Sequence, residues 1–154
     1  MENREWSMLE QVLKLTCGVT SRITALAKQE NLPATALKIL ILTSYSPFTC
    51  VSTLTECTGL QKGRISPLVQ ELVERGLISR HEGSDRRYSL LRLTPDGGRF
   101  LRNLLVDEIH RIEKVFRNPE APREDQLLEN MRLVADTLGF ASEVPRGREE
   151  ELAS

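Results

Sequence analysis

The sequence is poor in the residues on which most catalytic and metal sites depend. Its 154 residues include two histidines and three cysteines, and the cysteines lack the spacing of metal ligands or of a redox pair. It also contains neither a glycine-rich phosphate loop nor a recognisable pairing of a nucleophile with a base. We therefore expect no enzyme activity, no cofactor, no metal ion and no disulfide framework.

Long apolar runs and aromatic side chains are scarce as well. The longest apolar stretch, residues 39–43, is far shorter than the ~20 residues that cross a bilayer, and no signal or transit peptide opens the sequence. Aromatic residues make up 5% of the chain, which leaves few platforms for stacking the bases of single-stranded nucleic acids. We expect a soluble, cytoplasmic protein without a membrane partner.

Apolar residues do recur at three- and four-residue intervals along most of the chain, as they do in helices with one buried face. This pattern predicts six helices, over residues 6–29, 33–43, 52–58, 60–75, 95–118 and 123–138. The run 37–42 could also form a buried strand, but the alanines before it and the length of the segment favour a helix. The predicted fold class is therefore mainly α.

Turn and cap residues between the helices indicate a winged helix-turn-helix. Gly59 separates two short helices, the first with Ser52 as its predicted N-cap. Residues 77–81 and 88–93 flank a polar tip and predict a β-hairpin, the two-stranded β wing. The next helix start is predicted by a hydroxyl cap, a proline at the first helical position and a carboxylate, at Thr94, Pro95 and Asp96.

The second helix of a helix-turn-helix enters the major groove of DNA, and its first residues reach the edges of the bases. Lys62 and Arg64 stand there and suit guanine, while Gln61 suits adenine. Ser66 lies on the same stretch, and Arg80 adds a cation from the first strand of the wing. We predict that these five residues contact double-stranded DNA.

The tip of the wing carries two further cations, Arg86 and Arg87, on a projection able to enter a narrow minor groove. Asp85 beside them is expected to hold one arginine in a fixed rotamer through a fork-shaped hydrogen bond. These residues belong to a basic segment, residues 61–92, in which seven cations stand against four carboxylates although the net charge of the chain is −1. The alternative interpretation of the tip is an ordinary solvated turn.

Together these motifs resemble the MarR family of bacterial multiple-antibiotic-resistance regulators. The resemblance spans roughly residues 9–138 and is carried by residues 54–60, 65–66, 72–80, 85–87 and 93–97. Its most specific parts are the Asp-Arg-Arg of the wing and the Leu-Thr-Pro-Asp-Gly that opens the following helix. The resemblance implies a triangular homodimer that binds a pseudo-palindromic operator, usually as a repressor, and responds to a small ligand or an oxidant.

Three features depart from the family pattern. Pro67 lies inside the recognition helix, where a lost hydrogen bond predicts a kink or a late start. Thr55 and Thr58 stand where small or apolar residues are usual, which predicts slightly weaker packing of the first short helix. Gly97 and Gly98 each cost helix stability, by about 0.8–1.0 kcal/mol relative to alanine.

The apolar stripes of the first and the last two helices exceed what the small winged core can cover, so we expect them to pack across a two-fold axis. This predicts one domain with a solvated tail. The predicted parts are a single domain over 1–139, a winged core over 33–94, dimerisation helices over 6–30 and 95–139, and a tail over 140–154.

Two sensing hypotheses remain open. Cys17 lies on the first helix, where some hydroperoxide-sensing members of the family carry a reactive cysteine, although no tyrosine stands beside it here. Cys50 and Cys57, which flank the first short helix, are expected to be more exposed than Cys17. A small-molecule cleft between the dimerisation helices and the core is expected to involve residues that suit a core equally well, Leu13, Leu37, Ile41 and Leu101. The alternative function is a winged-helix module for protein–protein interaction without specific DNA binding.

Overall fold

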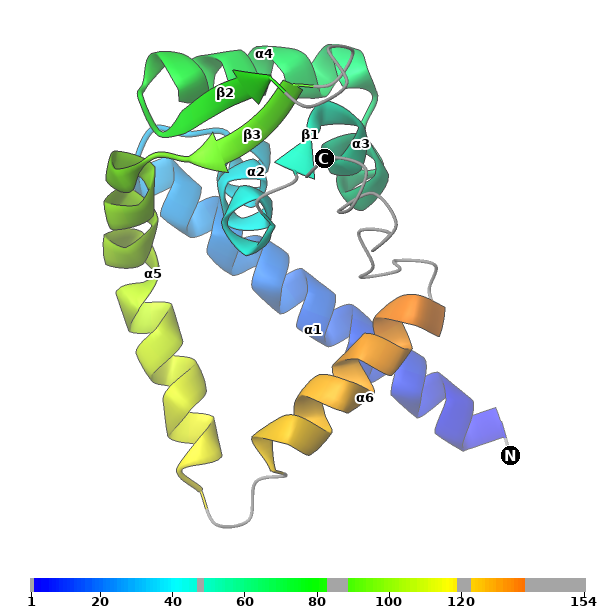
Figure 1. Cartoon of the computed structure of the whole chain (residues 1–154). Coiled ribbons are helices and arrows are strands. Elements are labelled where there is room, and N and C mark those ends of the chain that lie inside the picture. Colours follow the sequence, from blue (N-terminus) through cyan, green and yellow to red (C-terminus); the bar gives the residue numbers. More distant parts are fainter. Residues whose placement is uncertain (1, 47–48, 83–88, 119–122, 138–154) are drawn as a thin grey trace.

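The computed structural model describes residues 2–46, 49–82, 89–118 and 123–137, and its elements follow the predicted order of a winged helix-turn-helix (Figure 1). No helix within these ranges combines the length and the apolar character needed to cross a membrane. In chain order the elements are α1 (Glu2–Gln29), α2 (Ala34–Tyr45), β1 (Thr49–Cys50), α3 (Val51–Thr58), α4 (Lys62–Glu74), β2 (Ile78–Glu82), β3 (Ser89–Leu93), α5 (Pro95–Phe116) and α6 (Glu124–Thr137).

The ambiguous apolar run 37–42 is helical, as we predicted, but α2 continues past the turn expected at Ser44. Thr43 and Ser44 donate their hydroxyl hydrogens to helix carbonyls, those of Ile39 at 2.8 Å and Ile41 at 2.6 Å. Both hydroxyl groups therefore form their hydrogen bonds within the helix, and neither residue ends it. The helix stops at Ser46, which has extended backbone angles.

The prediction that Ser52 caps α3 is wrong. The N-cap is Cys50, and Ser52 lies in the first turn with its Oγ 2.9 Å from Cys50 Sγ. Cys50 is also buried, which corrects the expectation that it is more exposed than Cys17. The reason is that Thr49 and Cys50 form a short strand that pairs with the sheet and draws the thiol inward.

The sheet has three antiparallel strands in the order β1-β3-β2, one more than the predicted wing. β2 and β3 form the expected hairpin, with Ile78 opposite Leu93 and Glu82 opposite Ser89. β1 adds Thr49 opposite Leu91 on the other edge of β3. The extra strand ties the segment before α3 to the wing, so the helix-turn-helix and the hairpin are joined through backbone hydrogen bonds.

One apolar core holds the winged part together. Leu37 and Leu40 of α2, Leu54 of α3, Ile65 of α4 and Leu91 of β3 are completely buried there. Each of these side chains contributes roughly 1.5–3 kcal/mol when it leaves water, so the relative position of the elements is strongly specified. The C-terminal end of α1 joins this core through Ala27.

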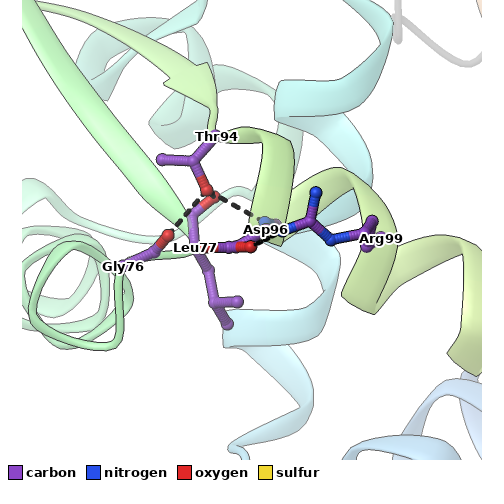
Figure 2. A network of polar contacts seen from close by, with 6 residues as sticks. Gly76, Leu77, Thr94, Asp96 and Arg99 are labelled. Carbon is purple, nitrogen blue, oxygen red and sulfur yellow. Dashed lines mark hydrogen bonds and ion pairs between the residues drawn. The ribbon is translucent and has the colours of Figure 1, made fainter.

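The start of α5 is fixed against the end of the recognition helix (Figure 2). Thr94 caps α5 as predicted, because its Oγ1 accepts a hydrogen bond from the Gly97 N–H at 2.9 Å. The same hydroxyl donates to the carbonyl oxygen of Gly76 at 2.6 Å, and the Thr94 N–H donates to that of Leu77 at 3.1 Å. The junction therefore links α5 to the turn that follows α4.

Outside the core, α1, α5 and α6 keep large apolar side chains exposed in the single chain. α5 leads away from the winged core, and α6 is the next helix along the chain (Figure 1). More than half of the side chain of Trp6, Leu13, Ile112 and Leu133 is accessible. Among the side chains that the structure describes on these helices, the exposed large apolar ones are Trp6, Leu9, Leu13, Leu15, Val19, Val106, Ile109, Ile112, Leu128, Met131, Leu133 and Val134.

Candidate nucleic-acid interface

The first helix of the helix-turn-helix, α3, ends at Gly59, as predicted. Gly59 has a φ of 68°, and its N–H donates to the carbonyl of Thr55 at 2.9 Å. The two threonines that depart from the family pattern do not leave polar groups unpaired, since Thr55 donates to the Ser52 carbonyl and Thr58 to that of Leu54, both at 2.6 Å. The turn thus sets α4 at a defined angle to α3.

The two sides of α4 differ in burial. Ile65, Val69 and Leu72 are completely buried and bind the helix to the core. The predicted DNA-contacting residues lie elsewhere on the helix, with Gln61, Lys62 and Arg64 exposed and Ser66 partly buried. Within the residues that the structure describes, neither Lys62 nor Arg64 forms an ion pair. Their charges are therefore available to an external anion.

The N-terminus of α4 adds to this positive surface. Its N-cap is Gln61, whose side chain makes no capping hydrogen bond, and the first turn contains no acidic residue. The first N–H groups of a helix have no partner inside it and carry the positive end of the helix dipole. Such an end favours a phosphate, so backbone and side chains present charge of the same sign.

Pro67 does not delay the start of the recognition helix, which runs from Lys62 to Glu74 with the proline inside. Pro67 is exposed, on a different side of the helix from the buried Ile65 and Val69. The hydrogen bond that it removes would have reached the carbonyl of Gly63, which is exposed too. Water can therefore satisfy that carbonyl, which limits the cost of the proline.

Arg80 of the wing is connected to the recognition helix. Its Nη2 donates to Gln70 Oε1 at 3.3 Å, and Gln70 Nε2 donates in turn to Glu74 Oε1 at 3.1 Å. Sequence reasoning missed Gln70, although its place two turns after Lys62 on the same helix could have indicated it. Asp85, Arg86 and Arg87, predicted for the tip of the wing, lie outside the described residues.

The three cysteines differ in environment. Cys17 and Cys57 are exposed and Cys50 is buried. Burial acts to raise the pKa of the Cys50 thiol, but hydrogen bonds with Ser52 and Thr53 outweigh it, and the net pKa is lowered. Cys57 is exposed as a residue, but partial desolvation of its thiol, and then the negative charge of Glu56, raise its pKa. The described residues contain no group of histidine, cysteine and carboxylate side chains placed to hold a metal ion.

A cleft of about 470 Å³ lies between α1 and α5. An ion pair spans the two helices there, with Arg22 Nη1 3.2 Å from Glu108 Oε1. The residues predicted for a ligand cleft do not line it, because Leu37 and Leu101 are buried in the core and Leu13 is an exposed residue of α1. Its lining residues are Arg22, Ala25, Leu26, Gln29, Glu30, Phe100, Asn103, Leu104, Asp107, Glu108 and Arg111.

The chain matches no known family model, and no curated protein is similar to it in sequence. Its structure is similar to that of the transcriptional regulator BldR from Sulfolobus solfataricus, with a TM-score of 0.68 and 22% identity over 89% of this chain and 98% of BldR. A MarR-family transcriptional regulator from Rhodococcus sp. RHA1 gives a TM-score of 0.62 and 22% identity over 85% of this chain and 93% of the regulator.

A third similar structure is that of CouR from Rhodococcus jostii RHA1, determined with p-coumaroyl-CoA bound. Its TM-score is 0.61 and its identity 21%, over 88% of this chain and 94% of CouR. The fold and the exposed cationic helix define the chain as a winged helix-turn-helix protein. More particularly, it has the winged-helix fold of MarR-family regulators, as the sequence motifs predicted.

Proposed function

We propose that the protein is a homodimeric transcriptional regulator that binds double-stranded DNA in a sequence-specific way. The observation that carries this proposal is the exposed N-terminal part of α4, where Gln61, Lys62 and Arg64 face outward without ionic partners among the described residues. Arginine and lysine bind guanine O6 and N7, and glutamine binds adenine. Arg80 and the predicted wing residues Asp85, Arg86 and Arg87 would extend the contacts to the backbone and the minor groove.

The apolar side chains left exposed on α1, α5 and α6 support the dimer. A soluble monomer rarely exposes a large amount of apolar surface, and a second copy of the same helices is the simplest way to cover it. A two-fold axis between the copies would present two α4 helices to successive turns of one face of DNA, about 34–36 Å apart. We accordingly assign residues 33–94 to the DNA-binding core and 6–30 and 95–139 to dimerisation.

Such a regulator acts in the cytoplasm, and we propose that it represses transcription until a small ligand or an oxidant releases it. The cleft between α1 and α5 supports a ligand, since both helices are assigned to dimerisation and a molecule bound between them would contact both. CouR, which has a similar fold, was determined with p-coumaroyl-CoA bound. For an oxidant the candidate is Cys17, which is exposed on α1. Loss of DNA binding after mild peroxide, prevented by Cys17→Ser, would support this second route.

The experiment that tests DNA binding is selection of duplexes from a random pool with the full chain. We expect one enriched pseudo-palindrome, whose association constant falls with salt with a log–log slope of about −3 or steeper, because each of two protomers presents at least two cations. Candidate ligands and peroxide are then tested for release of the selected duplex. Absence of salt-sensitive binding would contradict the proposal and favour the protein–protein interaction module.

A further inference from the structure

The C-terminal end of the recognition helix is attached to the end of α1 by one side chain. Arg75, the residue that caps α4, donates from Nη2 to the carbonyl oxygen of Asn31 at 3.0 Å, and from Nη1 to that of Glu30 at 3.5 Å. The same Nη2 lies 2.7 Å from Glu71 Oε1, one turn earlier on α4. The guanidinium thus joins α4 to the turn between α1 and α2.

The acceptors of Arg75 are held in place by the way α1 ends. Asn31 has a φ of 51°, and the N–H groups of Asn31 and Leu32 donate to the carbonyls of Lys28 and Ala27 at 3.3 and 2.9 Å. This is the hydrogen-bond pattern of a Schellman motif. It satisfies the last turn of the helix and leaves the carbonyls of Glu30 and Asn31 directed outside the ladder, where Arg75 reaches them.

The next two residues of the chain make the corresponding attachment to α5. Gly76 and Leu77 receive the hydrogen bonds from Thr94, the cap of α5, as Figure 2 shows. Three consecutive residues at the end of the recognition helix therefore bond to both helices assigned to dimerisation, α1 through Arg75 and α5 through Gly76 and Leu77.

Arg75 supplies directional hydrogen bonds, which the apolar core beside it lacks. Burial of Ile65, Val69 and Leu72 holds α4 against the core, but non-directional apolar contacts resist a small rotation of the helix less than directional hydrogen bonds do. A planar guanidinium bonded to two backbone carbonyls and one carboxylate restricts that rotation, because its donors form a rigid fork. Lysine carries the same charge but has no such fork.

We propose that Arg75 is a positioning residue that fixes the recognition helix relative to the dimerisation helix α1 and thereby sets the spacing of half-sites that the dimer accepts. The inference rests on the proposed function, because spacing has a meaning only for two linked recognition helices. Lengthening the centre of an operator by one base pair moves a half-site by about 3.4 Å and rotates it about the duplex. A dimer with a rigid attachment cannot follow this change, and one with a loose attachment can.

The test uses the duplex selected by the wild-type chain and two copies of it with one central base pair inserted or removed. Dissociation constants are measured at one fixed salt concentration. We expect the wild type to bind the original spacing about tenfold or more tightly than the altered ones, comparable with the cost of a mismatched base pair. For Arg75→Ala and Arg75→Lys the ratio should fall to about threefold or less. A general loss of electrostatic attraction would lower all three affinities together and leave the ratio unchanged.

Arg117→Ala is the charge control, since it removes one positive charge from an exposed side chain just after α5. If sedimentation shows that this variant is still a dimer, it should keep the wild-type ratio. Unfolding by urea identifies a variant that is merely destabilised, and if Arg75→Ala is so affected, Arg75→Lys decides. An Arg75 variant of wild-type stability that retains the tenfold ratio overturns the inference while leaving the proposed function intact. A wild-type chain that selects no duplex contradicts the proposed function and this inference together.

Discussion

Gly97 lies against the backbone of Leu77 so closely that a Cβ atom there would overlap the Leu77 carbonyl oxygen and lie 2.9 Å from its carbonyl carbon. The first turn of α5 therefore approaches the start of the wing without space for a side chain. From the sequence alone, Gly97 is only one of two adjacent glycines, Gly97 and Gly98, that each lower helix stability. The structure gives it a role, because close approach of two backbone segments requires glycine.

The two adjacent glycines should respond in opposite ways to the same substitution. Gly97→Ala forces α5 away from Leu77 and should lower the free energy of unfolding by about 1–3 kcal/mol, the usual cost of overpacking. Gly98 has no atom within 4 Å of an added Cβ and no positive φ, so Gly98→Ala should raise that free energy by about 0.5–1 kcal/mol. Urea unfolding of both variants checks the pair. Equal effects would mean that the contact with Leu77 has no energetic importance.

The Thr94 hydroxyl both accepts from Gly97 and donates to Gly76, so its removal should cost more than an ordinary cap residue. We expect Thr94→Ala to lower the free energy of unfolding by about 1–2 kcal/mol. Thr94→Ser keeps the hydroxyl, so its free energy of unfolding should stay close to that of the wild type. Thr24, whose hydroxyl only donates to a carbonyl of its own helix, is the control, with Thr24→Ala expected within about 0.5 kcal/mol of the wild type. A Thr94→Ser variant as unstable as Thr94→Ala would contradict the role of the hydroxyl.

Charge reversal at the start of α4 should strongly weaken binding of the selected duplex without unfolding the chain. Lys62 and Arg64 are exposed and unpaired in the described structure, so Lys62→Glu and Arg64→Glu remove no internal interaction. Each should weaken binding by at least about 1–3 kcal/mol, the discrimination carried by one base contact. Electrophoretic shift and circular dichroism check binding and fold, with Arg117→Glu, just after α5, as the control. Wild-type affinity in the α4 variants would remove this helix from the interface.

The three thiols should react with a disulfide reagent in an order set by access. Cys50 should react more slowly than the exposed Cys17, although its pKa is lowered, because the buried thiol must first become accessible. The pKa of Cys57 is raised, so its thiolate fraction at neutral pH is reduced and its reaction should accelerate through a higher pH range than that of an ordinary thiol. Mass spectrometry of partially labelled chain at several pH values identifies each site. Cys50 labelled as fast as Cys17 would contradict its burial.

Local signals in the sequence predicted much of this fold. Thr94, Pro95 and Asp96 define the start of α5 by cap and dipole chemistry that acts within one turn, and the structure confirms them. The periodic apolar residues of α4 likewise predicted which of its residues are buried, and this left Gln61, Lys62 and Arg64 for the exposed surface.

Features that depend on distant parts of the chain were not predicted. β1 has two residues, too few for an alternating pattern, and it exists because β3 offers Leu90 and Leu91 as partners. The cleft was assigned to apolar residues such as Leu37, whereas the space between α1 and α5 is lined mainly by polar ones. Arg75 was counted only as one cation of a basic segment, since its bonds to Glu30 and Asn31 cross more than 40 residues of sequence.

Sedimentation of the full chain, alone and with the selected duplex, tests most directly whether two recognition helices act as one unit. The free chain should sediment as a dimer of the 17.4 kDa protein, and with DNA the species formed should contain two chains on one duplex. Replacing one half-site by unrelated sequence should then weaken the complex. The complex that still forms should contain two chains on one duplex, not one. A stable monomer that binds the duplex tightly would contradict the account.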